Sequence, residues 1–289
     1  MTPVSRPMVT VVVPTRNRPE LLARALASIA AQTWRELQVI VVNDAGCDVA
    51  EVVKPFLTRP EDQYLRHDAN RGLSAARNTA LAAAAGKYVA YLDDDDRWLP
   101  HHVETLVTAL ERAGAAIGYA NAIRVRHTRV NGEYTESGRT VADEPWDRTR
   151  MVLANYLNPV AFMHTLACVR ECGGFDERLT RSEDMDLWIR ISARHEVLHV
   201  PVATCEYRMV DDGSNMTSAS AEPFLRARAL IFSKYPDEVT RAVDEMIDRW
   251  LRNEREVKRC HAALHSGVSG FLRRVENWVR DRVGPGGPR

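Results

Sequence analysis

The stretch Tyr88–Pro100 reads Tyr-Val-Ala-Tyr-Leu-Asp-Asp-Asp-Asp-Arg-Trp-Leu-Pro, so an apolar run leads directly into four consecutive carboxylates. This pattern predicts a buried strand that ends at a polar edge. Four like charges repel one another at short range, so a folded chain needs a positive partner beside them. Mg²⁺ is one candidate, because it takes carboxylate oxygens and substrate phosphates as ligands. A solvated acidic turn is the alternative that this stretch leaves open.

A β-α-β pattern precedes the acidic run. The β-branched run Met8–Val13 and the run Leu37–Val42 predict strands that are buried on both faces, as in a parallel sheet. Between them, residues 19–31 carry an apolar stripe at helical spacing, and Pro19 suits a helix start. This order implies an open α/β sheet, whose ligands bind at the carboxyl ends of the strands. We expect a mixed, mostly parallel central sheet flanked by helices.

Composition narrows the class of protein. The 289 residues include 45% hydrophobic and 27% charged side chains, with 39 basic and 39 acidic residues. No excess charge favours nucleic acid as a partner. The N-terminus shows no signal-peptide pattern and no apolar run reaches membrane-spanning length, so we expect a cytoplasmic protein. The five cysteines lack the paired spacing of a zinc site or a disulfide framework, which favours reduced thiols.

The turn after the first strand and the end of the second strand bear on nucleotide binding. The turn, Pro14–Pro19, lacks the G-x-G-x-x-G glycines of a dinucleotide-binding fold, so a dehydrogenase is disfavoured. Asp44 follows the second strand, where its carboxylate can accept hydrogen bonds from a nucleotide base or ribose. Capping of a helix that we expect near Val49 is the alternative role.

Two arginines and an acidic helix start add candidate ligands. Arg71 and Arg77 bracket the first turns of a helix predicted over residues 73–84. Helix N–H groups and two guanidinium groups suit a nucleotide diphosphate, while surface charge is the alternative for each arginine. A later helix begins near Glu183 with carboxylates in its first turn, where the helix dipole favours them. Helix capping alone accounts for one of these acids.

These blocks together resemble a known family. The sequence resembles family 2 glycosyltransferases with the GT-A fold, a Rossmann-like α/β architecture. The resemblance covers roughly the first three quarters of the chain and is carried by Val-Val-Val-Pro-Thr-Arg-Asn-Arg (11–18), Val-Val-Asn-Asp (41–44), Asn-Arg-Gly-Leu-Ser-Ala-Ala-Arg-Asn (70–78), Leu-Asp-Asp-Asp-Asp-Arg-Trp-Leu-Pro (92–100), Gly-Gly-Phe-Asp (173–176) and Ser-Glu-Asp-Met-Asp-Leu-Trp (182–188).

The resemblance implies an activity and a set of roles. It implies transfer of a sugar, with inversion, from a UDP, GDP or dTDP sugar to an acceptor hydroxyl, with Mg²⁺ or Mn²⁺ as cofactor. Asp184 matches the catalytic base, with Glu183 and Asp186 as second choices, and Asp95 is the expected metal ligand, with Asp93 as a further candidate. The division of roles among Asp93–Asp96 stays open by one position. We expect the nucleotide sugar to contact Pro14, Thr15, Arg18, Asp44, Arg71, Arg77, Asp93 and Asp94.

The acceptor side is less readable. Candidates are Glu183, Trp188 and His164, although a hydrogen-bonded structural role is the alternative for the histidine. Residues 116–127 predict one or two strands, residues 130–133 a hairpin turn, and residues 165–169 a strand. Cys168 and Cys172 would pair as metal ligands only on a helix, against which Gly173-Gly174 argues.

One expected residue is missing. Members of the family often carry a histidine shortly after a pair such as Tyr207-Arg208, but this chain continues with Asp211 and Asp212. We expect either of these aspartates to replace the histidine as a metal ligand, or the segment to be a mobile loop that closes over the donor.

Helices dominate the C-terminal part. They are predicted at residues 222–234, 237 to about 264, and 269–283, before a disordered tail at 284–289. We expect a catalytic domain over 1–220, with a nucleotide-sugar half to about 115 and an acceptor half from about 116, and a helical extension over 221–289. The basic amphipathic helix at 269–283 favours packing on the catalytic domain or a homodimer over peripheral contact with the inner membrane surface.

Two other functions remain open from the sequence. A nucleotidyltransferase would show a Gly- and Lys-rich phosphate loop where this chain has Pro14–Pro19. A non-catalytic sugar-nucleotide-binding or scaffold protein is favoured only by the missing histidine and the C-terminal helices. The acceptor is a saccharide, a lipid-linked glycan or a small molecule, because a resemblance of fold does not transmit specificity.

Overall fold

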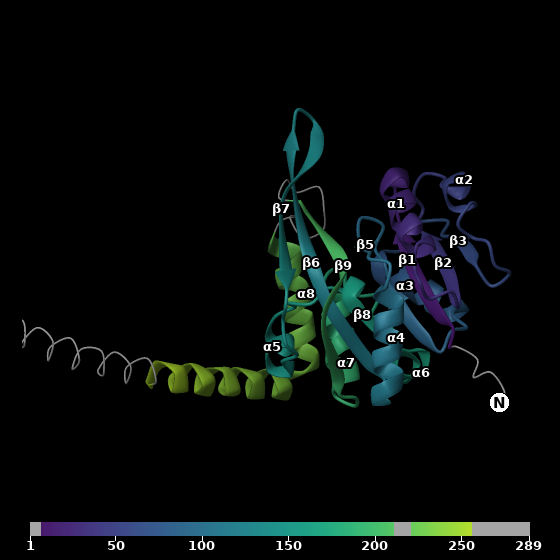
Figure 1. Ribbon diagram of the computed structural model, residues 1–289. Coiled ribbons are helices and arrows are strands. Elements are labelled where there is room, and N and C mark those ends of the chain that lie inside the picture. Colours follow the sequence, from purple (N-terminus) through teal and green to yellow (C-terminus); the bar gives the residue numbers. More distant parts are fainter. Residues whose placement is uncertain (1–6, 211–220, 256–289) are drawn as a thin grey trace, which may run out of the picture. The chain divides into compact units, whose positions relative to one another are not determined.

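The computed structural model describes residues 7–210 and 221–255 of the chain (Figure 1). The chain divides into two compact units, Met1–Pro236 and Asp237–Arg289. The first unit contains all the described strands and the helices α1 to α8, and in the second the described residues 237–255 are helical. The boundary expected after residue 220, between a catalytic domain and a helical extension, stays a prediction.

The first half of the sheet is parallel. Its strands are β1 (Val9–Thr15), β2 (Leu37–Asn43), β3 (Gln63–Arg66) and β4 (Tyr88–Tyr91), in the order β3-β2-β1-β4. The helices α1 (Pro19–Ala30), α2 (Ala50–Val53) and α3 (Leu73–Ala83) connect them. Every residue of β1 and β2 is buried, as their β-branched runs predict for strands covered on both faces.

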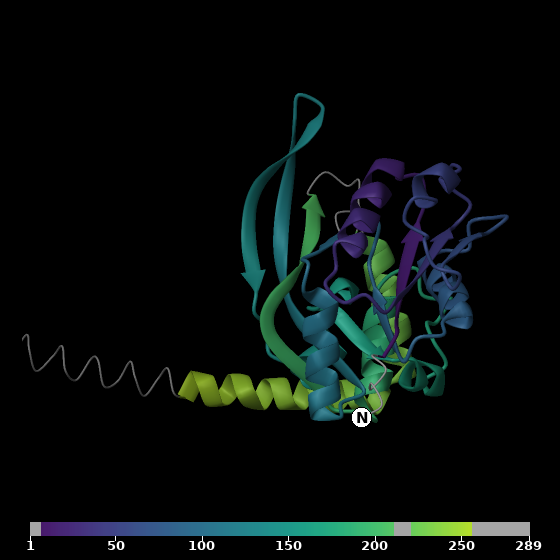
Figure 2. The ribbon, with the colours of Figure 1, turned by 45° about the vertical axis from the view of Figure 1, so that its right-hand side comes forward.

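The second half makes the sheet mixed. It continues from β4 in the order β8 (Phe162–Thr165), β6 (Ile117–Val130), β9 (Val197–Val210) and β5 (Arg97–Trp98). Strand β8 runs antiparallel to β4 and β6, whereas β9 runs parallel to β6. Strand β7 (Glu133–Ala142) pairs only with β6 among the described strands, and the β6–β7 hairpin projects beyond the rest of the sheet (Figures 1 and 2).

The remaining helices of the first unit are α4 (His102–Ala113), α5 (Arg148–Leu153), α6 (Leu166–Glu171), α7 (Glu183–Ser192) and α8 (Ala221–Lys234), with a 3₁₀ turn η1 at Pro159–Ala161. None of the described helices is both long and apolar enough to cross a membrane. The helix predicted to 264 is confirmed as far as residue 255. Asp211, Asp212, the helix expected at 269–283 and the tail lie outside the described residues.

The segment after His164 differs from the prediction. The predicted strand at 165–169 is wrong, because β8 ends at Thr165 and α6 begins at the next residue. Thr165 Oγ1 accepts the N–H of Cys168 and so caps the helix. Gly173 and Gly174 have φ values of 80° and 73°, so they form the turn that ends α6 rather than preventing a helix.

Three further features of the second half of the sheet are the extent of β9, the position of Trp98 and the turn between β6 and β7. Strand β9 is one strand of 14 residues, and Trp98 belongs to β5, which precedes α4. The hairpin turn at 130–133 is confirmed. Asn131 and Gly132 have φ values of 50° and 90°, the conformation that a two-residue β-hairpin favours.

Candidate active site

A pocket of about 670 Å³ opens where β1, β2 and β4 end. Open α/β sheets bind ligands at this edge. The loop before α3, the N-terminus of α7 and one face of α8 complete the wall. The wall contains the expected site residues Pro14, Thr15, Arg18, Asp44, Arg71, Arg77, Asp93, Asp94, Asp95, Glu183 and Asp184.

Asp44 anchors the loop before α3. Its Oδ1 accepts the N–H of Arg71 and its Oδ2 the N–H of Gly72, both at 2.8 Å, and Nδ1 of His67 lies 2.8 Å from Oδ1. Burial raises the pKa of Asp44, but these hydrogen bonds outweigh it and the net pKa is lowered. The N-cap of α2 is Val49, and the first N–H of the helix, that of Ala50, donates to Asp48 Oδ1, so the capping alternative for Asp44 is wrong.

Thr15 and Arg18 hold two aspartates of the acidic run. Thr15 Oγ1 donates to Asp94 Oδ2 at 2.8 Å, and Arg18 Nη1 lies 3.0 Å from Asp94 Oδ1 and 2.9 Å from Asp95 Oδ2. Burial raises the pKa of Asp94 to about 6 although Arg18 opposes this. Burial and the charge of Asp93 also raise the pKa of Asp95. Arg18 therefore offsets part of the repulsion among the four aspartates, and the acidic run still carries more negative than positive charge.

Two acidic clusters line the pocket, Asp93–Asp96 after β4 and Glu183-Asp184 at the start of α7, and Arg77 lies between them. Its Nη2 donates to Asp93 Oδ1 at 2.8 Å and its Nη1 to Glu183 Oε1 at 2.5 Å. The side chain is 1% exposed. Its guanidinium carbon lies 5.8 Å from the ring centre of Tyr91 and 5.3 Å from that of Phe175. Although burial lowers the pKa of Arg77, the two carboxylates raise it overall. Arg77 is therefore a buried cation that joins the end of β4 to the start of α7, rather than a surface charge.

Asp184 lies in the first turn of α7 and lines the pocket. Asn155 Nδ2 donates to both of its carboxylate oxygens, at 2.9 and 2.8 Å, and the N–H of Met185 donates at 2.9 Å. Burial, with the negative charge of Glu183, raises the pKa of Asp184 to about 7, although Asn155 and Arg77 lower it. A carboxyl group with this pKa changes protonation near neutral pH, which suits acid–base chemistry.

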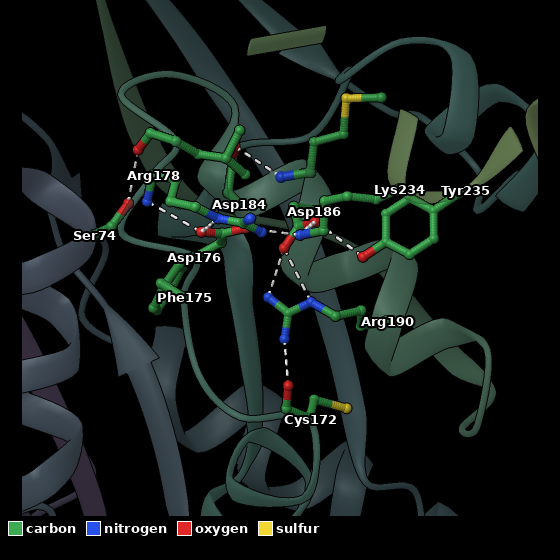
Figure 3. Close-up of polar contacts among 12 residues, drawn as sticks. Ser74, Cys172, Phe175, Asp176, Arg178, Asp184, Asp186, Arg190, Lys234 and Tyr235 are labelled. Atoms are coloured by element: carbon green, nitrogen blue, oxygen red, sulfur yellow. Dashed lines mark hydrogen bonds and ion pairs between the residues drawn. The ribbon is translucent and has the colours of Figure 1, made fainter. Parts of the chain in front are cut away.

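Asp186 connects α7 to α8 instead of lining the pocket. It is fully buried and accepts hydrogen bonds from Lys234, from Tyr235 at 2.9 Å and from Arg190 at 2.9 and 2.7 Å. Figure 3 shows these three side chains converging on the carboxylate. Lys234 also reaches Asp176 at 3.0 Å. The contacts fix the C-terminal end of α8 against the helix that carries Asp184.

Trp188 and His164 lie in the core rather than in the pocket. Both are fully buried, and Trp188 stacks on Phe162 with ring centroids 4.1 Å apart. His164 Nε2 lies 2.7 Å from the hydroxyl of Tyr91, and burial lowers its pKa to about 4. His164 therefore has the contacts of a buried, hydrogen-bonded structural histidine. Of the three acceptor-side candidates, Glu183 lines the pocket.

Several pocket residues were not singled out from the sequence: Asn155, Arg181, Arg208, Phe224 and Arg228. Arg181 directly precedes the Ser-Glu-Asp block, and Phe224 and Arg228 stand four residues apart on α8. These three positions could therefore have been proposed from the sequence. Nothing local marks Asn155, because its role depends on the long-range approach of α7 to the segment after α5.

A second cavity of about 620 Å³ shares Asp95, Asp96 and Arg208 with the pocket. Residues of α1, of β5 and of the β6–β7 hairpin line it. Its charges are largely paired, because Glu206 lies between Arg97 and Arg139, at 2.8 and 2.6 Å.

The acidic run also fits a divalent cation. The side chains of Asp93 and Asp95 are 28% and 15% exposed, and each also pairs with an arginine, Arg77 and Arg18 respectively. Asp94 and Asp96 are bound by Thr15 and by the N–H of Arg208. Two carboxylates that face a pocket are a donor set that Mg²⁺ and Mn²⁺ accept when phosphate oxygens complete the shell. Within residues 7–210 and 221–255, no group of three or more His, Cys, Asp and Glu side chains is arranged to hold a metal ion.

Comparison with known proteins identifies relatives. The sequence model of the family described as glycosyl transferase family 2 matches residues 10–171. The uncharacterized glycosyltransferase YwdF of Bacillus subtilis is 29% identical over 211 residues, which are 73% of this chain and 77% of that protein. The putative colanic acid biosynthesis glycosyl transferase WcaA of Escherichia coli is 25% identical over 82% of this chain and 85% of its own length. The chain spans 66% of a Mycobacterium tuberculosis protein to which it is 27% identical.

Solved structures share the fold. TarS of S. aureus, in complex with UDP-GlcNAc, has a TM-score of 0.62 at 21% identity, over 78% of this chain and 65% of that chain. The mannosyltransferase PcManGT of Pyrobaculum calidifontis, in complex with GDP-Man and Mn²⁺, has a TM-score of 0.55 at 20% identity, over 84% and 74%. At these identities the likeness concerns the fold, and it confirms the expected α/β architecture.

Proposed function

The chain belongs to glycosyl transferase family 2, and on this premise we propose that it moves a sugar from a nucleoside diphosphate sugar to an acceptor hydroxyl, with inversion at the anomeric carbon. One observation carries the proposal. A single pocket brings together the aspartates that end β4 and Asp184 at the start of α7, whose pKa is raised to about 7 by burial and by Glu183.

In this account the donor's nucleoside lies beside the loop before α3. Asp44 holds the N–H groups of Arg71 and Gly72, and so it fixes the loop against which the base and ribose would bind. Pro14 and Thr15 form the facing turn. TarS and PcManGT, which share the fold, bind UDP-GlcNAc and GDP-Man, and these donors support a UDP, GDP or dTDP sugar for this chain.

Asp95, together with Asp93, would hold Mg²⁺ or Mn²⁺ against the diphosphate. The cation supplies neutralisation of the negative charge on the departing diphosphate. Arg18 contributes a fixed positive charge at Asp94 and Asp95, and Arg77 keeps Asp93 in place from the other side. PcManGT binds Mn²⁺ together with GDP-Man, which supports this assignment.

Asp184 acts as the base. As the acceptor oxygen forms its bond to the anomeric carbon, the bond from that carbon to the diphosphate oxygen breaks, and the acceptor proton passes to the carboxylate of Asp184. Asn155 donates to both oxygens of this carboxylate and thereby fixes its orientation. In an inverting displacement the base lies on the face of the sugar opposite the leaving group.

A thermal-shift screen tests the donor site directly. Purified protein is heated with UDP, GDP, dTDP or CDP, each with Mn²⁺ and with EDTA. A ligand that binds the folded state raises the unfolding midpoint. The proposal expects one nucleotide family to raise the midpoint, and only when the metal is present. Equal midpoints with and without every nucleotide at saturating Mn²⁺ would contradict it.

A further inference from the structure

We propose that the pocket binds an acceptor that carries a phosphate group, held by Arg181 and Arg228 beside the ring of Phe224. This inference rests on the proposed function, because it names the class of acceptor for that same pocket. Both arginines line the pocket, and neither has an ion-pair partner among the residues that the structure describes.

Three other arginines of the pocket are already paired with carboxylates, whereas Arg208 lies over the ring of Tyr134 and Arg16 is exposed. Arg18 pairs with Asp94 and Asp95, Arg77 pairs with Asp93 and Glu183, and Arg71 lies 3.5 Å from Glu177. A guanidinium group in a pocket wall with no anion beside it has lost part of its hydration without a matching negative charge. A bound anion would supply that compensation.

Arg181 and Arg228 come from different elements that both line the pocket, and Phe224 relates the two positions. Phe224 and Arg228 stand four residues apart and so share a face of α8. The guanidinium of Arg181 lies 5.8 Å from the ring centre of Phe224. Its Nη1 donates to the carbonyl oxygen of Thr180 at 3.0 Å, whereas its buried Nε has no hydrogen-bond partner. The Nε–H of Arg181 is therefore a donor that no group of the described protein satisfies.

The position of these arginines assigns the anion to the acceptor. Arg181 stands three residues before Asp184, on the segment that leads into α7. In an inverting displacement the acceptor enters beside the base, while the diphosphate departs on the opposite face of the sugar. In the proposed function, Asp93 and Asp95 of the acidic run would hold a cation against that diphosphate. We therefore assign the positive charge on the segment that leads to Asp184 to the incoming acceptor.

The chemistry of the two side chains favours phosphate. Two guanidinium groups offer paired N–H donors that match the oxygens of a phosphate. The cluster keeps its geometry because Lys234 and Tyr235, at the end of the same helix, bind the buried Asp186 of α7. The occupant is a phosphomonoester or phosphodiester attached to the molecule that presents the hydroxyl.

Calorimetric titration with glycerol 1-phosphate and with glycerol tests the proposal. Each probe is titrated into the full chain alone and into the chain saturated with Mn²⁺ and the nucleoside diphosphate that it binds. We expect glycerol 1-phosphate to bind in both cases and glycerol to bind at least tenfold more weakly. The double variant R181Q/R228Q should lose about tenfold in affinity for glycerol 1-phosphate, with nucleotide affinity within twofold of wild type. Arginine-to-lysine changes at both positions should restore part of the affinity.

Arg226→Gln is the matched control, because Arg226 is an exposed arginine on the same helix that pairs with Glu222. It should leave the affinity for glycerol 1-phosphate unchanged. Competition between glycerol 1-phosphate and the nucleoside diphosphate, equal binding of both probes, or undiminished binding by the double variant would each overturn the proposal. A chain that binds no nucleotide contradicts the proposed function instead, and the titration without nucleotide still reports on the two arginines.

Discussion

Arg77 Nη1 donates to Glu183 Oε1 at 2.5 Å and so joins α3 to the start of α7 across 106 residues of sequence. The same guanidinium holds Asp93, so one buried cation fixes both acidic clusters of the pocket. Asp184 follows Glu183 directly. The distance between the proposed metal ligands and the proposed base therefore depends on a residue that itself needs no contact with substrate.

Replacing Arg77 by Gln should destabilise the fold. The change leaves Glu183 buried without its counter-ion, and breaking a buried pair costs about 3–5 kcal/mol of unfolding free energy. Arg71→Gln is the control, because its pair with Glu177 is about half exposed and should contribute less than about 1 kcal/mol. Urea unfolding measures the free energy of unfolding of both variants. Equal losses would show that the buried pair contributes no more to stability than the exposed pair.

Turnover should rise with pH and level off near neutrality. The base must be ionised, and burial with the charge of Glu183 raises the pKa of Asp184 to about 7, so the rate should fall about tenfold per pH unit below that value. Asn155→Ala removes hydrogen bonds that favour the ionised form, and it should move the profile to higher pH. A flat wild-type profile from pH 5.5 to 8.5 would be incompatible with Asp184 as the base.

Asp184→Asn should stabilise the protein at high pH. The folded-state pKa of about 7 exceeds the unfolded value of about 3.9, so the folded state binds the proton more tightly and loses stability as pH rises between these values. The neutral amide removes this loss. We expect the variant to gain on the order of 2–4 kcal/mol relative to wild type at pH 8, and much less near pH 4. Urea unfolding at both pH values decides this, and a gain of the same size at each would contradict the buried-charge explanation.

Removing Lys234 should loosen α8. In Lys234→Met the buried Asp186 loses a charged hydrogen-bond partner, which costs about 1.5–3 kcal/mol. The exposed pair of Arg226 with Glu222 provides the comparison, since Arg226→Gln should cost less than about 0.5 kcal/mol. Amide hydrogen exchange should show faster exchange along α8 in Lys234→Met alone. Unchanged protection would mean that the lysine does not hold the helix.

The sequence patterns predicted the parallel half of the fold well, because β1 and β2 are buried on both faces and their β-branched runs record that environment. The same reasoning failed at residues 165–169, where apolar and β-branched residues suggested a strand but the cap of Thr165 starts a helix. Periodicity does not separate a short buried strand from a short buried helix.

Some residues of the candidate site were predictable from the sequence pattern and others were not. Residues at strand ends were predictable, since parallel strands bring their carboxyl ends to one edge of the sheet. Asn155, Phe224 and Arg228 reach the pocket from the segment after α5 and from α8, and their positions depend on tertiary contacts such as Lys234 with Asp186. Trp188 closely follows the Ser-Glu-Asp block in sequence, yet the helix directs its ring into the core against Phe162.

Release of nucleoside diphosphate from a panel of UDP, GDP and dTDP sugars, with Mn²⁺ or EDTA, tests the central claim most directly, because water can replace an unknown acceptor. Wild type should turn over sugars of one nucleotide family only with the metal. Asp184→Asn should lower this rate by about 10²–10⁴ while nucleotide binding stays intact, since general-base catalysis contributes about that factor. Undiminished release by the variant, or no release by wild type at saturating Mn²⁺, would contradict the account.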